Sequence, residues 1–291
     1  MVWTSKTAFK LGRVSNLPTV WSNTLAGVVL AGASPFNWNI ITLLVAMTFA
    51  YTGGMFLNDA FDRKIDAKER PERPIPAGEI SAAEVFAAGF TLLIGAVFFT
   101  VLAVLGWHGH IAMAVISAVL LCGAIVLYNV WHKNNPLSPA IMGACRMLVY
   151  LCAGFTASTS PFPVLYIGAL VLLAYLMGLT YVAKQENLNK VENLWPVAFI
   201  AAPIVFGLYT TMTDAQVGVP LLILAAWLVF CLYLIRRRHS GDIPRAVISM
   251  IAGIALVDAE FIATTSSLSL AFLAVAAFAL TLALQRFVSG T

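Results

Sequence analysis

Charged residues are scarce in this chain. Lys, Arg, Asp and Glu make up 10% of the 291 residues, while hydrophobic residues make up 60%. Soluble proteins carry about 25% charged residues, so this deficit excludes an ordinary soluble domain. The hydrophobic residues come in runs of about 17–25, the length of a helix that crosses a bilayer. We therefore expect an all-α, polytopic transmembrane helical bundle that forms a single domain over residues 1–291.

Cysteine is also scarce, and neither sign of charge dominates. The four cysteines fall inside apolar runs and form no Cys-x-x-Cys pair, which argues against a disulfide framework or a zinc site. The net charge of +4 is explained by membrane topology, so no nucleic-acid partner is indicated. The opening residues are too mixed for a cleavable signal peptide, and a hydrophobic run follows them directly, so we expect no such peptide.

Ten hydrophobic runs are candidates for membrane spans, and the basic residues agree with this count. If the N-terminus is cytoplasmic, all but one of the 17 Lys and Arg residues fall in cytoplasmic segments, the exception being Arg146. Such a distribution follows the positive-inside rule. We therefore expect a multi-pass protein of the bacterial cytoplasmic membrane with both termini cytoplasmic. The runs lie at about 17–33, 38–57, 84–106, 110–130, 137–157, 162–183, 195–212, 217–236, 245–264 and 268–287.

Three carboxylates gather in the polar stretch that follows the second run. Asp59, Asp62 and Asp66 stand at i, i+3 and i+7, positions that share one face of a helix. Three like charges repel one another, and hard oxygen ligands suit Mg²⁺. The stretch predicts a site for Mg²⁺ and a diphosphate at the membrane surface, with a solvated loop of mixed charge as the alternative. The cations in and just after it are Arg63, Lys64, Lys68, Arg70 and Arg73.

This stretch resembles the first aspartate-rich motif of the UbiA superfamily of intramembrane prenyltransferases. The resemblance implies a bundle of nine to ten spans, nine being common in the family. It also implies Mg²⁺-dependent transfer of a prenyl group from a polyprenyl diphosphate to an unidentified small-molecule or lipid acceptor. The matching residues are Asn58-Asp59-x-x-Asp62-x-x-x-Asp66 and Arg70-Pro71-x-Arg73-Pro74-Ile75-Pro76-x-Gly78-x-Ile80-Ser81.

The resemblance implies roles for the residues of this motif. Asp59, Asp62 and Asp66 are expected to bind Mg²⁺ that bridges to the diphosphate, and Asp59 and Asp62 are expected to be catalytic. Asn58 is expected to add a neutral oxygen ligand or a hydrogen bond. The expected phosphate contacts are Arg63, Lys64, Arg70 and Arg73.

The polar loop after the sixth run departs from the family pattern. Relatives place aspartates there, whereas this chain has Lys184 and Glu186. Either Lys184 replaces a metal ion as the counter-charge of the diphosphate, with Glu186 as a weak carboxylate for catalysis, or catalysis is reduced or lost. The second case would leave a non-catalytic membrane protein that binds or exports a lipid-linked metabolite. The stretch from Tyr181 to Glu186 resembles the EboC-like (Ebo-operon UbiA-like) branch of the superfamily.

Four further residues are candidates for substrate binding. Arg146 is a charge inside a span, which usually faces a polar cavity; the alternative is a structural pair with a neighbouring helix. Lys133 flanks the same cytoplasmic mouth. Asn23 either lines the cavity or ties two helices together. The ring of Tyr181 could shield a carbocation.

Two acidic residues and one histidine complete the candidates. Asp258 and Glu260 lie in the ninth run, where an ionisable residue suggests a function, with a polar outer vestibule as the alternative. We expect His132 to be a solvated loop residue.

The charge distribution makes the topology testable. We expect a reporter fused after Thr291 to read as cytoplasmic, because ten spans return the chain to the side on which it begins. An external reading would contradict the count of ten and favour nine spans.

Overall fold

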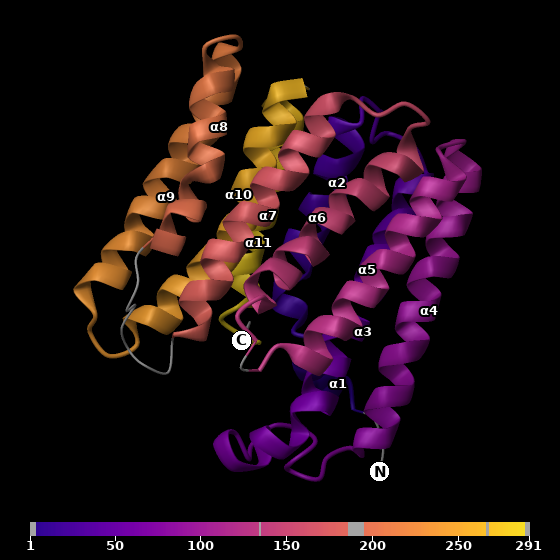
Figure 1. The fold of residues 1–291 in the computed structure, drawn as a ribbon, viewed down its shortest axis with the longest axis vertical. Helices are drawn as coiled ribbons and strands as arrows, with labels where there is room; N and C mark the ends of the chain where they lie inside the picture. The colour runs from indigo at the N-terminus through magenta and orange to yellow at the C-terminus, as the bar shows by residue number, and fades with distance from the viewer. Residues whose placement is uncertain (1–3, 134, 186–194, 266–267, 289–291) are drawn as a thin grey trace.

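The structure is a computed structural model that describes residues 4–133, 135–185, 195–265 and 268–288 (Figure 1). Within these ranges the chain forms helices and no strands. Short 3₁₀ turns lie at Val14–Asn16 (η1), Trp195–Ala201 (η3) and Ala215–Val217 (η4). The helices are α1 (Ser5–Leu11), α2 (Leu17–Leu30), α3 (Asn39–Glu69), α4 (Ala82–Trp107), α5 (Ile111–Trp131), α6 (Ser138–Ala157), α7 (Pro163–Lys184), α8 (Ala202–Thr211), α9 (Gly218–Arg237), α10 (Asp242–Thr265) and α11 (Leu268–Leu284).

The predicted all-α membrane bundle is confirmed. Each of the ten predicted runs contains a helix, and among the described residues seven helical segments are long and apolar enough to cross a membrane. The other three runs contain α2, α8 and α11, which have 14, 10 and 17 residues. A span needs about 20 residues, so the difference between seven and ten rests on these three short helices.

The helices that lie at the centre of the bundle are α2 and α10. In α10, 89% of the most hydrophobic window is buried inside the protein, compared with 22% in α5. A helix that is apolar on all sides is buried, whereas α5 presents a broad face to lipid. Figure 1 shows α3, α4 and α5 on one side of the bundle, and α8 and α9 on the other. Residues on α2 and α10 are therefore placed between the two sides.

The long helix α3 carries the aspartate motif beyond the hydrocarbon layer. Its 31 residues correspond to about 46 Å at 1.5 Å per residue, whereas the hydrocarbon layer is about 30 Å thick. Asp59, Asp62 and Asp66 lie in the last third of the helix. Figure 1 shows this end of α3 near α1, so the N-terminal segment lies beside the motif.

A glycine allows α2 and α6 to pack closely. A Cβ atom at Gly27 would lie 2.7 Å from the carbonyl oxygen of Tyr150 and 2.8 Å from the Cβ of Ala153. Small residues at such positions let two membrane helices approach. One turn earlier on each helix stand Asn23 and Arg146, so the same close contact brings these two side chains together.

The close approach at Gly27 is testable by adding one methyl group. We expect Gly27→Ala to lower the melting temperature, because overpacking costs about 1–3 kcal/mol and exceeds the gain in helix propensity, about 1 kcal/mol. The matched control is Gly123→Ala in α5, where an added Cβ meets nothing within 4 Å. Equal melting temperatures for the two variants would show that the α2–α6 contact is not tight.

Candidate functional site

A cavity of about 550 Å³ opens where the aspartate end of α3 faces α6, α7 and α10. It gathers side chains that are far apart in the sequence, from the segment before α2 to the middle of α10. Most of the predicted site residues contribute to its wall. Those that line it are Asn58, Asp62, Asp66, Arg70, Arg73, Lys133, Arg146 and Lys184.

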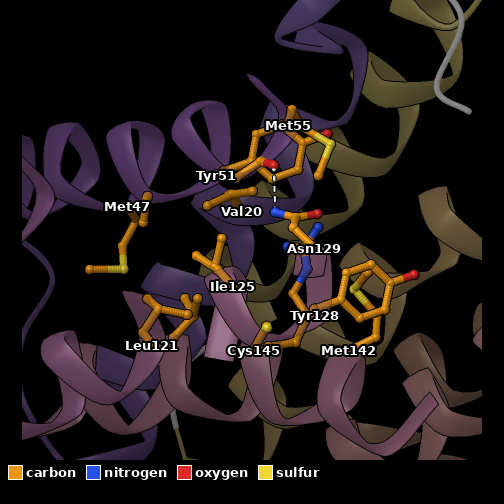
Figure 2. A pocket seen from close by; sticks show the side chains of 14 residues that line it. Val20, Met47, Tyr51, Met55, Leu121, Ile125, Tyr128, Asn129, Met142 and Cys145 are labelled. Carbon is orange, nitrogen blue, oxygen red and sulfur yellow. Dashed lines mark hydrogen bonds between the residues drawn. The ribbon is translucent and has the colours of Figure 1, made fainter. Parts of the chain in front are cut away.

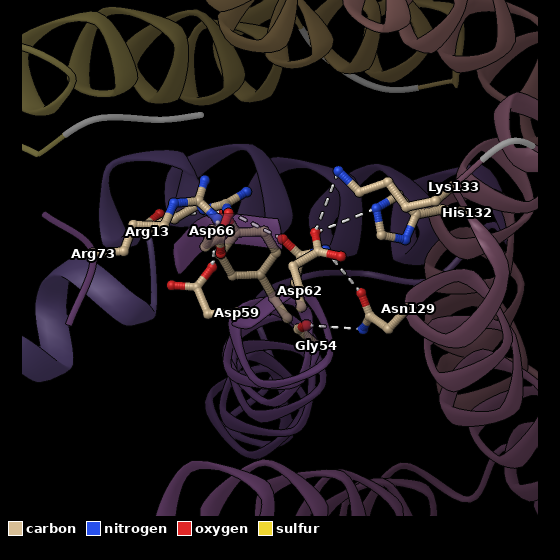
Figure 3. A network of polar contacts seen from close by, with 11 residues as sticks. Arg13, Gly54, Asp59, Asp62, Asp66, Arg73, Asn129, His132 and Lys133 are labelled. Atoms are coloured by element: carbon tan, nitrogen blue, oxygen red, sulfur yellow. Dashed lines mark hydrogen bonds and ion pairs between the residues drawn. The ribbon is translucent and has the colours of Figure 1, made fainter. Parts of the chain in front are cut away.

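Two arginines compensate two of the carboxylates on α3. Arg73 Nη1 lies 2.8 Å from Asp66 Oδ2 and 3.3 Å from Asp59 Oδ1, and Arg13 Nη2 lies 3.2 Å from the same Asp59 oxygen. Figure 3 shows these side chains converging on one face of the helix. The aspartates are buried, with Asp59 and Asp66 each 5% exposed. Buried like charges need such partners, because an uncompensated charge in the interior is strongly destabilising.

The third carboxylate, Asp62, faces the loop between α5 and α6. His132 Nε2 lies 3.4 Å and Lys133 Nζ 3.8 Å from Asp62 Oδ2, as Figure 3 shows. The His132 ring also stacks on Tyr128 at a centroid distance of 4.9 Å. The prediction that His132 is a solvated loop residue is therefore wrong: its side chain is 13% exposed and lines the cavity.

An amide chain holds the motif against α5. Asn58 Oδ1 accepts a hydrogen bond from Arg13 at 3.1 Å, and Asn58 Nδ2 donates to Asn129 Oδ1 at 3.1 Å. Asn129 in turn donates to the carbonyl oxygen of Gly54 at 3.0 Å. The carbonyl side of the Asn58 amide therefore faces the cation Arg13.

The opposite wall of the cavity carries a lysine. Lys184, the last residue of α7, donates to the carbonyl oxygen of Asn135 at 2.8 Å and to Ser138 Oγ at 2.9 Å. Within the described ranges, no carboxylate lies at ion-pair distance from its ammonium group. The charge of Lys184 is held in place by neutral groups and faces the cavity.

Arg146 enters the cavity from deeper in the bundle. It lies eight residues into α6, about 12 Å along the helix axis. Its Nη1 donates to Asn23 Oδ1 at 2.7 Å and its Nη2 to Thr19 Oγ1 at 3.0 Å, and its guanidinium lies 5.9 Å from the ring centroid of Tyr51. Arg146 therefore lines the cavity, as one prediction has it, and also bonds to the neighbouring helix α2, as the alternative has it.

An apolar pocket of about 100 Å³ adjoins the cavity at this depth. Figure 2 shows Val20, Met47, Leu121 and Ile125 around it. The pocket and the cavity share five lining residues, so the polar space continues into an apolar one. The shared residues are Tyr51, Met55, Tyr128, Met142 and Arg146.

Some predicted residues lie elsewhere. Arg63 donates to the carbonyl oxygen of Ala60 at 2.7 Å and covers the Phe86 ring at 5.5 Å, and Lys64 is exposed. Successive side chains of an α-helix are rotated by about 100° around its axis. Arg63 and Lys64 follow Asp62 by one and two residues, so they lie on other faces of α3 and do not line the cavity.

Two further predicted residues are absent from the cavity wall, and a third, predicted to be catalytic, is not described by the structure. Tyr181 packs against the hydrophobic core. Asn23 is fully buried and reaches the cavity only through Arg146. Glu186 lies outside the described residues.

Sequence reasoning missed Arg13 and Asn129 as partners of the motif. Arg13 adopts a left-handed conformation with φ of 41° between α1 and α2, which no periodic pattern reveals. The signal that could have singled it out is topological, because the positive-inside rule places Arg13 on the same side of the membrane as the aspartates.

The donors at this site fit Mg²⁺ only together with a ligand. Among the described residues, no three His, Cys, Asp or Glu side chains are close enough to hold an ion. Mg²⁺ is commonly held by one or two carboxylates together with substrate phosphates and water. The cavity offers Asp62 and Asp66 for this purpose, and Asp59 stands next to them.

The fold and the site define a multi-pass integral membrane protein in which one cavity joins a charged mouth to an apolar pocket. Residues 20–247 match the UbiA prenyltransferase family. The chain belongs to this family, as the aspartate motif predicts.

Curated relatives cover part of the chain. Digeranylgeranylglyceryl phosphate synthase of Methanopyrus kandleri is 31% identical over 203 residues, which are 68% of this chain and 69% of that protein. Protoheme IX farnesyltransferase 1 of Cenarchaeum symbiosum is 29% identical over 157 residues, which are 53% of this chain and 49% of that protein. The chain thus spans between about half and just over two thirds of the length of these relatives. The resemblance to the EboC-like branch stays a prediction.

Solved structures share the fold. A UbiA homologue from Aeropyrum pernix K1 superposes with a TM-score of 0.65 at 15% identity, covering 89% of this chain and 98% of that one. A UbiA homologue from Archaeoglobus fulgidus, bound to GPP and Mg²⁺, superposes with a TM-score of 0.59 at 12% identity, covering 88% and 99%. At these identities the likeness shows the fold alone.

Proposed function

We propose that this protein transfers a prenyl group from a polyprenyl diphosphate to a small-molecule or lipid acceptor within the membrane. One observation carries the proposal: a single cavity holds carboxylates and basic side chains at its mouth and continues into an apolar pocket at Arg146. A diphosphate matches the mouth and a prenyl chain matches the pocket. Family membership supports the same reaction.

Mg²⁺ fits the acidic face of the mouth. Asp62 and Asp66 line the mouth and would hold it together with the diphosphate and water, whereas Asp59, the third predicted ligand, is paired with Arg13 and Arg73. When bound, the ion would supply positive charge to the departing group. Arg73 is placed to exchange a carboxylate for a phosphate oxygen, since its Nη1 is shared by Asp59 and Asp66. Arg70 and Lys133 line the same mouth.

The reaction needs cleavage of the allylic C–O bond, with the electron pair leaving on the diphosphate. Basic side chains aimed at this negative charge stabilise it as it develops. The carbocation that remains has to be shielded from water until the acceptor donates its electron pair and loses a proton. The rings of Tyr51 and Tyr128 stand where the polar cavity meets the apolar pocket, and aromatic faces attract cations.

Lys184 is the counter-charge on the wall opposite the aspartates. Among the described residues, its ammonium is held by Asn135 and Ser138 rather than by a carboxylate, so we infer that its charge is available to a phosphate. The resemblance to the UbiA superfamily implies aspartates and a second metal ion in this region. We infer that Lys184 replaces that ion and that the site needs fewer Mg²⁺ ions.

Release of inorganic diphosphate tests the activity. Purified protein with Mg²⁺ and a panel of prenyl diphosphates and acceptors is expected to release it. Binding of a prenyl diphosphate with no release for any acceptor would instead favour a non-catalytic protein that binds or exports a lipid-linked metabolite.

The carboxylates are expected to act through the metal ion. Asp62→Asn keeps the shape of the side chain and removes its charge, so affinity for a prenyl diphosphate should fall at least about tenfold in Mg²⁺, the effect of about 1.4 kcal/mol. The affinity should hardly change when Mg²⁺ is removed by a chelator. Asp214→Asn, in the turn before α9, is the control. Equal affinities of Asp62→Asn and parent in Mg²⁺ would mean that Asp62 is not a ligand.

Substitution of Lys184 separates an altered enzyme from an inactive one. Lys184→Ala should weaken prenyl diphosphate binding at fixed Mg²⁺ by about ten- to a hundredfold, because a hydrogen bond to a charged group contributes about 1.5–3 kcal/mol. Lys64→Ala, which removes an exposed lysine of α3 outside the cavity, should leave binding unchanged. An unaltered affinity of Lys184→Ala would refute the counter-charge role.

A further inference from the structure

A second polar cluster lies inside the bundle, behind the cavity wall. Its centre is Asp258 in α10, whose side chain is fully buried. Asn23 Nδ2 donates to both carboxylate oxygens, at 2.7 and 2.9 Å, and the hydroxyls of Ser22 and Tyr150 each donate at 2.5 Å. These hydrogen bonds favour the charged form of the carboxylate, while its burial opposes that form.

The direction of donation is fixed along the hydrogen bonds that lead from Arg146 through Asn23 to Asp258. A charged carboxylate can only accept, and a guanidinium can only donate. Asn23 lies between the two, so its amide must turn the NH₂ group toward Asp258 and the oxygen toward Arg146. The distances agree with this orientation at both ends, 2.7 Å from Asn23 Nδ2 to Asp258 Oδ1 and 2.7 Å from Arg146 Nη1 to Asn23 Oδ1.

The same chain connects two opposite charges. Within the part of the chain that the structure describes, no carboxylate forms a direct ion pair with Arg146. A charged side chain inside a membrane bundle is costly unless it is paired or faces water. Asp258 is the carboxylate that Arg146 reaches through one intervening amide, and Thr19 satisfies a second guanidinium nitrogen.

Arg146 has more donors than its bonds to Asn23 and Thr19 use. A guanidinium has five N–H groups, of which Asn23 and Thr19 take two in this structure. The guanidinium also lines both the cavity and the apolar pocket. Its orientation therefore decides whether the remaining donors point at the place where polar and apolar spaces meet.

We propose that Asp258 and Asn23 are positioning residues that hold Arg146 at the junction of the cavity and the apolar pocket, with Asp258 as its counter-charge. The benefit to diphosphate binding rests on the proposed function, but the electrostatic connection between Asp258 and Arg146 does not. Neither Asp258 nor Asn23 lines the cavity, so each acts on a ligand only through Arg146.

A double-mutant cycle of melting temperatures tests the electrostatic connection between Asp258 and Arg146 without any ligand. Asp258→Asn removes the counter-charge and should lower the melting temperature by several degrees. In an Arg146→Ala background the same substitution should cost much less or stabilise the protein, because it then removes a buried carboxylate that has no cation. An equal decrease in both backgrounds would show that the two charges are not connected and would overturn the proposal.

A swapped variant covers the case in which single variants fail to fold. Asn23→Asp combined with Asp258→Asn moves the carboxylate next to Arg146 and turns the amide around, and the net charge is unchanged. The single amide oxygen at position 258 then accepts from Tyr150, while Ser22 donates to the carbonyl oxygen of Thr19, which it already reaches at 3.2 Å, so every donor still meets an acceptor. We expect this double variant to fold and to melt well above Asn23→Asp alone, in which two carboxylates face each other. A double variant no more stable than Asn23→Asp would contradict the assigned orientation of the Asn23 amide, in which its oxygen accepts from Arg146 and its NH₂ group donates to Asp258.

Binding of geranyl S-thiolodiphosphate, a donor analogue that resists cleavage, tests the effect on the site. Asn23→Leu changes no charge but releases Arg146, so affinity should fall about tenfold, as for loss of a hydrogen bond to a charged group. It should not fall further in the Arg146→Ala background. An equal fall in both backgrounds would show that Asn23 does not act through Arg146.

Two controls separate this proposal from the proposed function. Glu260→Gln replaces a buried carboxylate two residues after Asp258 in α10, which has no hydrogen-bond partner among the described residues, and it should leave analogue affinity unchanged. A loss as large as that of Asn23→Leu would make the effect unspecific and overturn the proposal. If Asp62→Asn does not change analogue binding in Mg²⁺, the proposed function fails, while the ligand-free melting cycle still decides the connection between Asp258 and Arg146.

Discussion

The site depends on the compensation of three buried carboxylates that share one face of α3. Without Arg13 and Arg73, which come from the segment before α2 and the loop after α3, Asp59 and Asp66 would repel each other at the mouth. These ion pairs therefore fix the N-terminal segment and the loop against the end of α3. They also leave the mouth ready to accept a ligand that brings its own charge, since cations and anions can exchange partners without changing the fold.

Much of this arrangement follows from the sequence. The carboxylates of α3 share a face because of their spacing, and hydrophobic length predicts the helices. Arg146 and Lys184 are singled out by their positions: Arg146 is a charge inside a span, and Lys184 stands where the family resemblance implies aspartates. Such features depend on local periodicity and on the cost of a charge in lipid, both of which a single segment reveals.

Other parts required the three-dimensional packing. Asn23, Tyr150 and Asp258 stand on three different helices, and their contact depends on α10 lying in the centre of the bundle beside α2 and α6. No sequence spacing connects them. His132 likewise belongs to the site because the C-terminal end of α5 lies beside Asp62, whereas its position between two hydrophobic runs predicts a solvated loop residue.

The depth of Arg146 gives the two ends of the cavity different dielectric surroundings. The ion pairs at the mouth lie near the water interface, where dissolved ions screen charges beyond about 10 Å at 0.1 M salt. Arg146 lies about 12 Å deeper along α6, where the effective permittivity is lower and its field is stronger. If the proposed diphosphate binds here, ionic strength should govern how quickly it is captured at the mouth, while the strength with which it is retained at the inner end should stay nearly independent of salt.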